Sequence, residues 1–207
     1  MPDLTFEIAL QARGLYRIAG IDEAGRGPLA GPVAAAAVIL PGGFNCPGLD
    51  DSKKISAPKR ELLYERLTTD AAIFWTVAIA DREEIDRLNI LRATHLAMRR
   101  AVEALDPAPD HCLIDGLPVK NFPLAHDGIV KGDGLSLSIA AASIIAKVTR
   151  DRIMREIDRE FPQFGFAKHQ GYGTKVHLEA LRIHGPCRHH RRSFQPVAQL
   201  ALPFDIG

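Results

Sequence analysis

The sequence has little of what marks a secreted or membrane protein. Its 207 residues include only three cysteines, which are far apart, odd in number and without Cys-x-x-Cys spacing (Cys46, Cys112 and Cys187). This usage suits free thiols in a reducing compartment better than a disulfide framework. No apolar run approaches the roughly 20 residues of a membrane-spanning helix, and the first residues lack the basic and apolar regions of a secretion signal. We therefore expect a cytoplasmic protein.

Aromatic residues are also few, at 6%, but a hydrophobic content of 46% is sufficient for a sizeable core. The length fits one domain. We predict an N-terminal segment over residues 1–15, a catalytic domain over 16–196 that includes a helical C-terminal part, and a flexible tail over 197–207. The net charge of +1 and the lack of an obvious exposed apolar stripe make a monomer the expected state.

The near-neutral net charge conceals an asymmetry along the chain. The segment 168–194 holds six Lys or Arg residues, five of the eight His residues and a single acid, Glu179, so it carries about +5. A basic segment beside an acidic site is typical of an enzyme that acts on nucleic acids, because cations bind the phosphate backbone. A solvated helix face is the alternative interpretation of the same charges.

Hydrophobic periodicity gives the order of the elements. Apolar runs predict strands over 16–22, 33–40, 71–80 and 112–116, and a fifth run over 129–133 repeats the layout of a strand that ends on an acid. Helices are expected over 56–67, with Ser56 as the N-cap, over 85–105 and over 135–161. Strands first, and then strands that alternate with helices, indicate a mixed α/β sheet.

Acids beside glycines end three of these strand-like runs, namely Asp22 with Glu23, Asp115, and Asp133. Because ligand sites in open α/β sheets gather at strand ends, these four carboxylates are expected to converge. Neighbouring acids repel one another unless a cation lies between them, and a set of carboxylates without Cys or His favours Mg²⁺ or Mn²⁺ over zinc. Two such ions about 3.5–4 Å apart can promote cleavage of a phosphodiester.

The long helix expected over 135–161 is apolar almost all round in its first half, apart from a polar stripe on one side of it. The members of the stripe are Ser136, Ser143, Lys147 and Arg150. Polar side chains on a buried helix need partners. Either the stripe satisfies internal groups, or it faces the same groove as the acids.

Together these residues resemble bacterial ribonuclease HII from about Tyr16 to Pro196. The resemblance is carried by Gly20–Pro28, Asp51–Lys54, Asp115–Gly116, Lys131–Asp133, Ala141–Asp151 and Gly171–Thr174, in the order and spacing of that family. It implies an RNase H-like fold, a mixed five-stranded sheet flanked by helices with a small helical C-terminal part. The implied activity is metal-dependent endonucleolytic cleavage of the RNA strand of RNA–DNA hybrids and 5′ of single ribonucleotides embedded in duplex DNA, which serves ribonucleotide removal and primer clearance.

The resemblance also assigns roles to individual residues. It implies that Asp22, Glu23, Asp115 and Asp133 hold two Mn²⁺ or Mg²⁺ ions and that the products carry a 3′-hydroxyl and a 5′-phosphate. The residues implied in substrate binding are Gly25, Arg26 and Gly27, which read the 2′-hydroxyl, Tyr172, which packs on a sugar, and Lys53, Ser143 and Lys147, which contact phosphates. Glycines allow close approach of the backbone to a groove, and the 2′-hydroxyl distinguishes RNA from DNA. Tyr172 could instead anchor a loop, and Lys147 could instead pair with an active-site acid.

Two features depart from the family pattern or lie outside its core. Leu117 follows Asp115–Gly116 where the family frequently has asparagine, and the His184–His190 stretch superficially resembles a zinc site that we do not expect to bind zinc. The tail over 199–204, from Gln199 to Phe204, resembles peptides that dock in the bacterial sliding clamp. The alternative is a tail that packs on its own domain or has no partner.

Two rival functions remain on the sequence alone. Ribonuclease HIII is similar in its catalytic domain but usually carries a further N-terminal domain. A non-catalytic nucleic-acid-binding protein on the same fold is disfavoured, because four repelling carboxylates are explained only by a bound metal.

Overall fold

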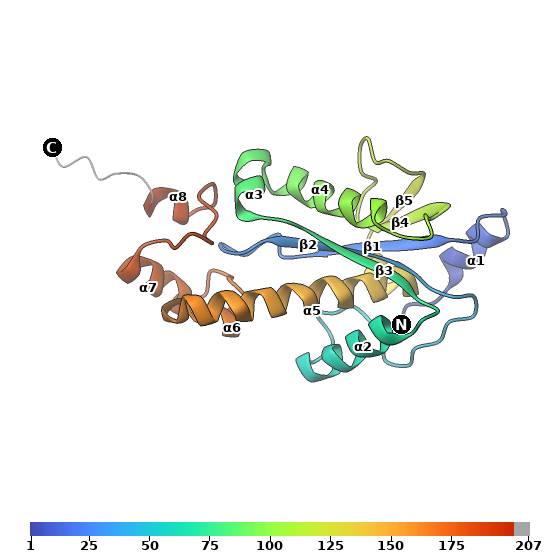
Figure 1. The fold of residues 1–207 in the computed structure, drawn as a ribbon, viewed down its shortest axis with the longest axis horizontal. Coiled ribbons are helices and arrows are strands. Elements are labelled where there is room, and N and C mark those ends of the chain that lie inside the picture. Colours follow the sequence, from blue (N-terminus) through green and yellow to red (C-terminus); the bar gives the residue numbers. More distant parts are fainter. Residues whose placement is uncertain (201–207) are drawn as a thin grey trace.

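The computed structural model describes residues 1–200 and contains one mixed five-stranded sheet, in the order β3-β2-β1-β4-β5 (Figure 1). The strands are β1 (Ile18–Ala24), β2 (Val33–Ile39), β3 (Phe74–Ala80), β4 (His111–Asp115) and β5 (His126–Ile129). The β1-β2 and β2-β3 pairs are antiparallel, whereas β1-β4 and β4-β5 are parallel. The expected mixed five-stranded sheet flanked by helices is thus confirmed.

Helices cover both faces of this sheet. The long helix α5 (Leu137–Glu160) and α2 (Ala57–Thr69) lie on one face, and α3 (Arg82–Leu88) and α4 (Ile90–Glu103) lie on the other (Figure 1). The side chains of β2 alternate between the two layers: Ala36 and Val38 pack in the cluster with α5, and Ala35 and Ala37 pack in the cluster with α4. Small side chains on β2 therefore allow both helices to approach the central strands.

A glycine brings α5 closest to the sheet. A Cβ atom on Gly20 of β1 would overlap the backbone of Ser138 in the first turn of α5. Gly20 and Asp22 are two residues apart on the strand, so both face α5. This close approach fixes the position of α5 beside the end of β1 that carries Asp22.

The structure corrects several element predictions. The single helix expected over 85–105 is two helices, because Asn89 has a φ of 68° and its side chain accepts a hydrogen bond from the Arg92 amide as an N-cap. Ser56 precedes α2 with extended backbone, but its side chain makes no capping hydrogen bond. The fifth strand ends at Ile129, and Asp133 lies in the following 3₁₀ turn η1 (Gly132–Gly134) rather than at a strand end.

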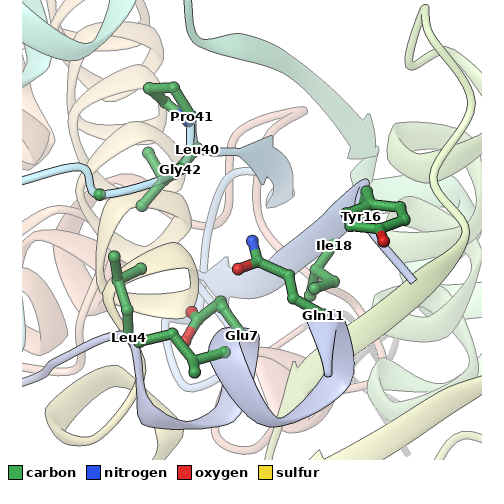
Figure 2. Close-up of a pocket in the computed structure, with 10 residues that line it drawn as sticks. Leu4, Glu7, Gln11, Tyr16, Ile18, Leu40, Pro41 and Gly42 are labelled. Atoms are coloured by element: carbon green, nitrogen blue, oxygen red, sulfur yellow. The ribbon is translucent and has the colours of Figure 1, made fainter. Parts of the chain in front are cut away.

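The N-terminal residues pack against the sheet through α1 (Thr5–Gln11). Glu7 is buried, and one of its carboxylate oxygens accepts hydrogen bonds from the Ser136 hydroxyl at 2.6 Å and from the hydroxyl and amide of Ser138 at 2.6 and 3.1 Å. Glu7 and Gln11 line a cavity of about 60 Å³ bounded by Leu40 and other residues (Figure 2). The segment before β1 is therefore hydrogen-bonded to the start of α5.

Four short helical segments form the C-terminal part, η2 (Pro162–Phe164), α6 (Phe166–His169), α7 (Lys175–His184) and α8 (Val197–Leu200). They gather at the far end of α5 (Figure 1). Phe164, Phe166 and Leu181 pack there with Leu29 and Ala30 of the β1-β2 connection. The small helical C-terminal part expected from the sequence is confirmed, but it extends into α8, which lies at the start of the segment predicted to be a flexible tail. Within residues 1–200, no helix is long and apolar enough to cross a membrane.

Candidate active site

Three carboxylates meet at one end of the sheet. Asp22 lies near the end of β1, Asp115 ends β4, and Asp133 lies in η1. Because β1 and β4 are parallel neighbours, their carboxyl ends reach the same edge. Each of the three residues offers one carboxylate oxygen, and these oxygens all lie within 4.8 Å of one another. The convergence expected from the sequence is therefore present for these three acids.

The electrostatics of this acidic triad favour a bound cation. Burial raises the pKa of Asp22 well above its ordinary value, and the negative charges of Glu23 and Asp115 raise it further. Burial and the charge of Asp115 likewise raise the pKa of Asp133. The nearest positive side chain is exposed, with Lys53 Nζ 3.8 Å from an Asp133 carboxylate oxygen. A buried, all-oxygen donor set of this kind fits a hard divalent ion such as Mg²⁺ or Mn²⁺.

Glu23 lies apart from the triad, because successive residues of a strand face opposite sides of the sheet. Its carboxylate is 3.4 Å from Arg26 Nη1. Burial raises the pKa of Glu23, and the nearby charge of Arg26 opposes that rise. Glu23, Arg26 and Asp115 line one cavity of about 360 Å³ beside α4. Asp115 also lines a second cavity of about 720 Å³ with Lys53 and Asp133, so it borders both the cavity that contains Glu23 and the cavity that contains Asp133.

The Gly25–Gly27 turn begins two residues after Glu23 and leaves no room for a side chain at its first residue. Gly25 has a φ of 100°, and a Cβ atom there would overlap the Arg150 side chain and lie 2.8 Å from the Pro32 carbonyl oxygen. Arg26 and Gly27 are exposed. A Cβ atom on Gly27 would lie 3.3 Å from the ring of Tyr172. The structure thus places the glycine turn, Arg26 and Tyr172 on one surface next to the acids.

The polar stripe of α5 divides between the two roles considered for it. Ser136 caps α5, and Arg150 donates hydrogen bonds to the carbonyl oxygens of Ala30, Pro32 and Gln170, so both satisfy internal groups. Ser143 is buried beside Asp22 and lowers the pKa of that carboxyl, and its hydroxyl oxygen lies 2.9 Å from that of Ser52.

Lys147 does not pair with any of the four acids. Its ammonium group is 2.5 Å from the Asp151 carboxylate, one turn further along α5. Burial lowers the pKa of Lys147, and the ion pair with Asp151 opposes that effect. The alternative in which Lys147 partners an active-site acid is therefore wrong.

Sequence reasoning missed two contributors to this region. The charge of Asp51 raises the pKa of Asp133, and Asp51 lines the larger cavity with Lys53. Its place in the Asp51–Lys54 motif was the available signal. Arg191 was counted only as part of a basic segment, but its guanidinium is fully buried under the Gly25–Gly27 turn. No local pattern in the sequence indicates that contact across 166 residues.

Two histidines of the C-terminal part, His177 and His190, bond to each other and to the backbone. The Nε2 atoms of His177 and His190 are 2.9 Å apart, and His190 Nδ1 lies 2.9 Å from the Cys187 amide nitrogen and 3.2 Å from its sulfur. The remaining ring nitrogen of His177 bonds to the Tyr172 carbonyl oxygen at 2.9 Å. Each of these ring nitrogens is thus occupied by a protein atom.

Comparison with known proteins agrees with this geometry. The family model described as Ribonuclease HII matches residues 19–197. The ribonuclease HII of Desulfitobacterium hafniense is 56% identical over 193 residues, which are 93% of this chain and 74% of the relative. The crystal structure of ribonuclease H2 from Pyrococcus horikoshii OT3 has a TM-score of 0.72 at 25% identity and covers 89% of this chain and 96% of its own.

A second solved structure is the PCNA:RNase HII complex from Archaeoglobus fulgidus. The matching chain has a TM-score of 0.72 at 26% identity, with 86% of this chain and 95% of that chain covered. The resemblance first drawn from motifs therefore extends over nearly the whole chain and to its three-dimensional structure.

Proposed function

The chain belongs to the ribonuclease HII family and is a ribonuclease H, and from this premise we propose that it cuts the RNA strand of RNA–DNA hybrids and cuts 5′ of single ribonucleotides embedded in duplex DNA. The observation that carries the proposal is the position of the Gly25–Gly27 turn. It begins two residues after Glu23, and Arg26 shares a cavity with Glu23 and Asp115. A segment able to contact a sugar thus lies directly beside carboxylates able to hold a metal.

We assign the metal-binding role to Asp22, Glu23, Asp115 and Asp133, with two Mg²⁺ or Mn²⁺ ions in the substrate complex. When bound, such ions supply the Lewis acid that activates water and stabilises the leaving oxygen of a phosphodiester. The protein's own contribution is to hold the carboxylates in place. The amide of Gly132 donates to Asp115 Oδ1 at 2.7 Å, and the amide of Glu23 donates to Asp22 Oδ1 at 2.7 Å. Attack of water at the phosphorus, with cleavage of the bond to the 3′ oxygen as the leaving group, gives products with a 3′-hydroxyl and a 5′-phosphate.

Selection of a ribose is assigned to the Gly25–Gly27 turn and Tyr172. The exposed backbone of Arg26 and Gly27 can bond to a 2′-hydroxyl, which serves as both donor and acceptor. The Tyr172 ring, 49% exposed and close to Gly27, offers a flat surface to the neighbouring sugar. Both features lie on the surface next to the acids.

The three predicted phosphate contacts differ in how well their positions suit that role. Lys53 has a side chain that is 80% exposed beside Asp133, so we propose that it binds a backbone phosphate. Ser143 is only 4% exposed, and its position favours orientation of Asp22. Lys147 is engaged with Asp151 and half-buried, so it reaches a phosphate only if that ion pair opens.

The decisive experiment is cleavage of a DNA duplex that contains one ribonucleotide, with Mg²⁺ or Mn²⁺ and with wild-type protein and Asp22→Asn compared. We expect the wild type to cut once, 5′ of the ribonucleotide, and the variant to lose at least about a hundredfold in rate, as expected when a catalytic charge is removed. An all-DNA duplex is the substrate control, and end analysis identifies the 3′-hydroxyl and 5′-phosphate. Equal cutting by both proteins would refute the site assignment, and cutting of neither ribonucleotide duplex nor hybrid would refute the activity.

We further propose that the enzyme works as a monomer in the cytoplasm and that the tail from Gln199 to Phe204 binds a sliding clamp. Most of this tail lies outside the described residues, which end with Leu200 in α8. Support for the clamp comes from the tail sequence and from the solved complex of an RNase HII with PCNA. Deletion of residues 199–207 should abolish clamp binding in a pulldown and leave cleavage of naked substrate unchanged. Retained clamp binding would contradict the proposal.

A further inference from the structure

The Arg191 guanidinium is fully buried and is bonded to backbone carbonyls of one surface segment. Its Nε donates to the Gly31 oxygen at 3.0 Å, Nη1 to the Arg26 oxygen at 2.9 Å, and Nη2 to the Gly25 oxygen at 2.5 Å. A fourth, longer hydrogen bond reaches the Pro32 oxygen at 3.3 Å. Two of the three residues of the Gly25–Gly27 turn therefore direct their carbonyl oxygens at one side chain from the C-terminal part.

This contact fixes the direction of two backbone amides. In a planar trans peptide the carbonyl of one residue and the N–H of the next point in opposite directions. Because the Gly25 and Arg26 carbonyls point inward to Arg191, the N–H groups of Arg26 and Gly27 point outward. Both residues are exposed, and neither amide donates to any acceptor within residues 1–200. The turn thus presents two adjacent unpaired donors on the surface beside the acids.

A second buried arginine supports the same turn from below. Arg150 Nε donates to the Pro32 oxygen at 2.9 Å, an acceptor that it shares with Arg191. Burial lowers the pKa of Arg191 to about 9, and the neighbouring charge of Arg150 contributes to the shift. Two like charges are thus held together in the interior with carbonyl oxygens as hydrogen-bond acceptors, an arrangement that costs free energy. A functional requirement for the geometry of the turn would explain why the protein tolerates this cost.

The residue before Arg191 is connected to the other half of the substrate surface. The Cys187 amide donates to His190 Nδ1, so His190 carries its proton on Nε2 and donates to His177 Nε2. His177 in turn donates from Nδ1 to the Tyr172 carbonyl oxygen at 2.9 Å. The adjacent residues His190 and Arg191 therefore hold the backbone on both sides of the contact between Gly27 and Tyr172.

We propose that Arg191 is a positioning residue for ribose selection, which sets the outward direction of the Arg26 and Gly27 amides so that they act as a paired hydrogen-bond donor to the sugar. The proposal rests on the proposed function, because Arg191 positions the Gly25–Gly27 turn to which that function assigns ribose selection. Arg191 touches neither the acids nor the exposed surface. Its loss should therefore reduce the preference for a ribonucleotide without a matching loss of general duplex binding.

The test compares affinities in an Asp22→Asn background, in which the duplex is not cut. The equilibrium constants are measured for a DNA duplex with one ribonucleotide and for the same duplex in all-DNA form. Arg191→Gln should lower the ratio of the two affinities by about 5- to 150-fold, the range expected for two hydrogen bonds of ordinary net strength. All-DNA binding should change by less than about twofold, a difference of less than about 0.5 kcal/mol. Arg191→Lys keeps a charged donor and should recover part of the ratio.

Arg192→Gln is the matched control, since its side chain is exposed and its backbone amide, which the change retains, donates to Asp86. It should leave the ratio unaltered. An unchanged ratio in folded Arg191→Gln, with folding checked by thermal unfolding, overturns the role of Arg191. Absence of any ribonucleotide preference in the protein with Arg191 intact refutes the proposed function instead.

A measurement without any change at Arg191 keeps the inference testable if Arg191→Gln does not fold. In the Asp22→Asn protein, the amide resonances of Arg26 and Gly27 should shift when the single-ribonucleotide duplex is added and shift less with the all-DNA duplex. Equal shifts with both duplexes would show that these amides do not read the ribose and would overturn the proposal.

Discussion

Replacement of Gly25 by alanine should damage both stability and ribose selection. A residue with a side chain at a φ of 100° costs about 1–3 kcal/mol in backbone strain. The new Cβ would also overlap the Arg150 side chain and lie 2.8 Å from the Pro32 oxygen. Displacement of Arg150 weakens a hydrogen bond from a charged donor to that oxygen, worth about 1.5–3 kcal/mol. We therefore expect a total loss of about 2.5–6 kcal/mol in the free energy of unfolding.

Gly27→Ala is the matched control for this prediction. A Cβ atom at Gly27 would meet only the ring of Tyr172, at 3.3 Å, and that ring is exposed enough to move. Its stability cost should stay within about 0.5 kcal/mol, as for other surface changes. Thermal unfolding measures both values, because each kcal/mol shifts the Tm of a domain of this size by about 2–4 °C. Equal Tm values for the two variants would refute the steric argument.

The same two variants test the role of the turn in selection. Both should reduce cutting at a single ribonucleotide more than they reduce binding to all-DNA duplex, since either change alters the surface that we propose to contact the sugar. Cleavage rates on the first substrate and equilibrium affinity for the second provide the comparison. A parallel loss of both would mean that the turn has only a structural role.

Three further predictions concern burial and charge. Glu7→Ala removes the acceptor of hydrogen bonds from Ser136 and Ser138 and should lower the free energy of unfolding by about 3 kcal/mol, whereas Glu7→Gln, which keeps an acceptor oxygen, should cost less in denaturant titrations. Burial lowers the pKa of His190 to about 4, so the unfolded chain binds a proton first on acidification. The contribution of neutral His190 to the free energy of unfolding should be fully present above about pH 6.5 and should fall by about 3 kcal/mol as the pH drops to 4. An equally steep pH dependence of stability in a His190→Gln variant would contradict this. Asp22→Asn removes a buried carboxyl whose pKa is raised by burial and by the charges of Glu23 and Asp115. The change should raise the Tm of the metal-free protein and reduce the gain in Tm on adding Mg²⁺. A lower Tm of the metal-free variant would contradict the repulsion between these acids.

The acids at the strand ends were predictable from the sequence, because the apolar runs that precede them are a local pattern. The alternating or continuous apolar runs of β1, β2 and β4 mark buried strands, and acids at the ends of β1 and β4 follow directly. The convergence of Asp22 and Asp115 then depends only on parallel pairing. Because side chains alternate along a strand, Glu23 points to the opposite face of the sheet from Asp22. The adjacency of the two acids in the sequence had instead suggested a cation between them.

Other features depended on tertiary contacts and had no local signal. Asn89 interrupts a pattern that reads as one helix, since its positive φ is imposed by the bend between α3 and α4. Lys147 forms an ion pair with Asp151 of the same helix. The four-residue spacing makes this pair possible but does not exclude other partners. The burial of Arg191 depends on the C-terminal part packing over the Gly25–Gly27 turn, which brings together residues from both ends of the chain.

The position of Arg191 late in the chain has a consequence for biosynthesis. A ribosome completes all four acids by residue 133, but the side chain that holds the Gly25 and Arg26 carbonyls is added almost 60 residues later. A nascent or truncated chain that stops before Cys187 contains all four acids but lacks the side chain that holds the Gly25–Gly27 turn. If Arg191 has the proposed role, a translational arrest or proteolytic cut in this interval leaves the four acids in the chain and removes the side chain on which ribose selection depends.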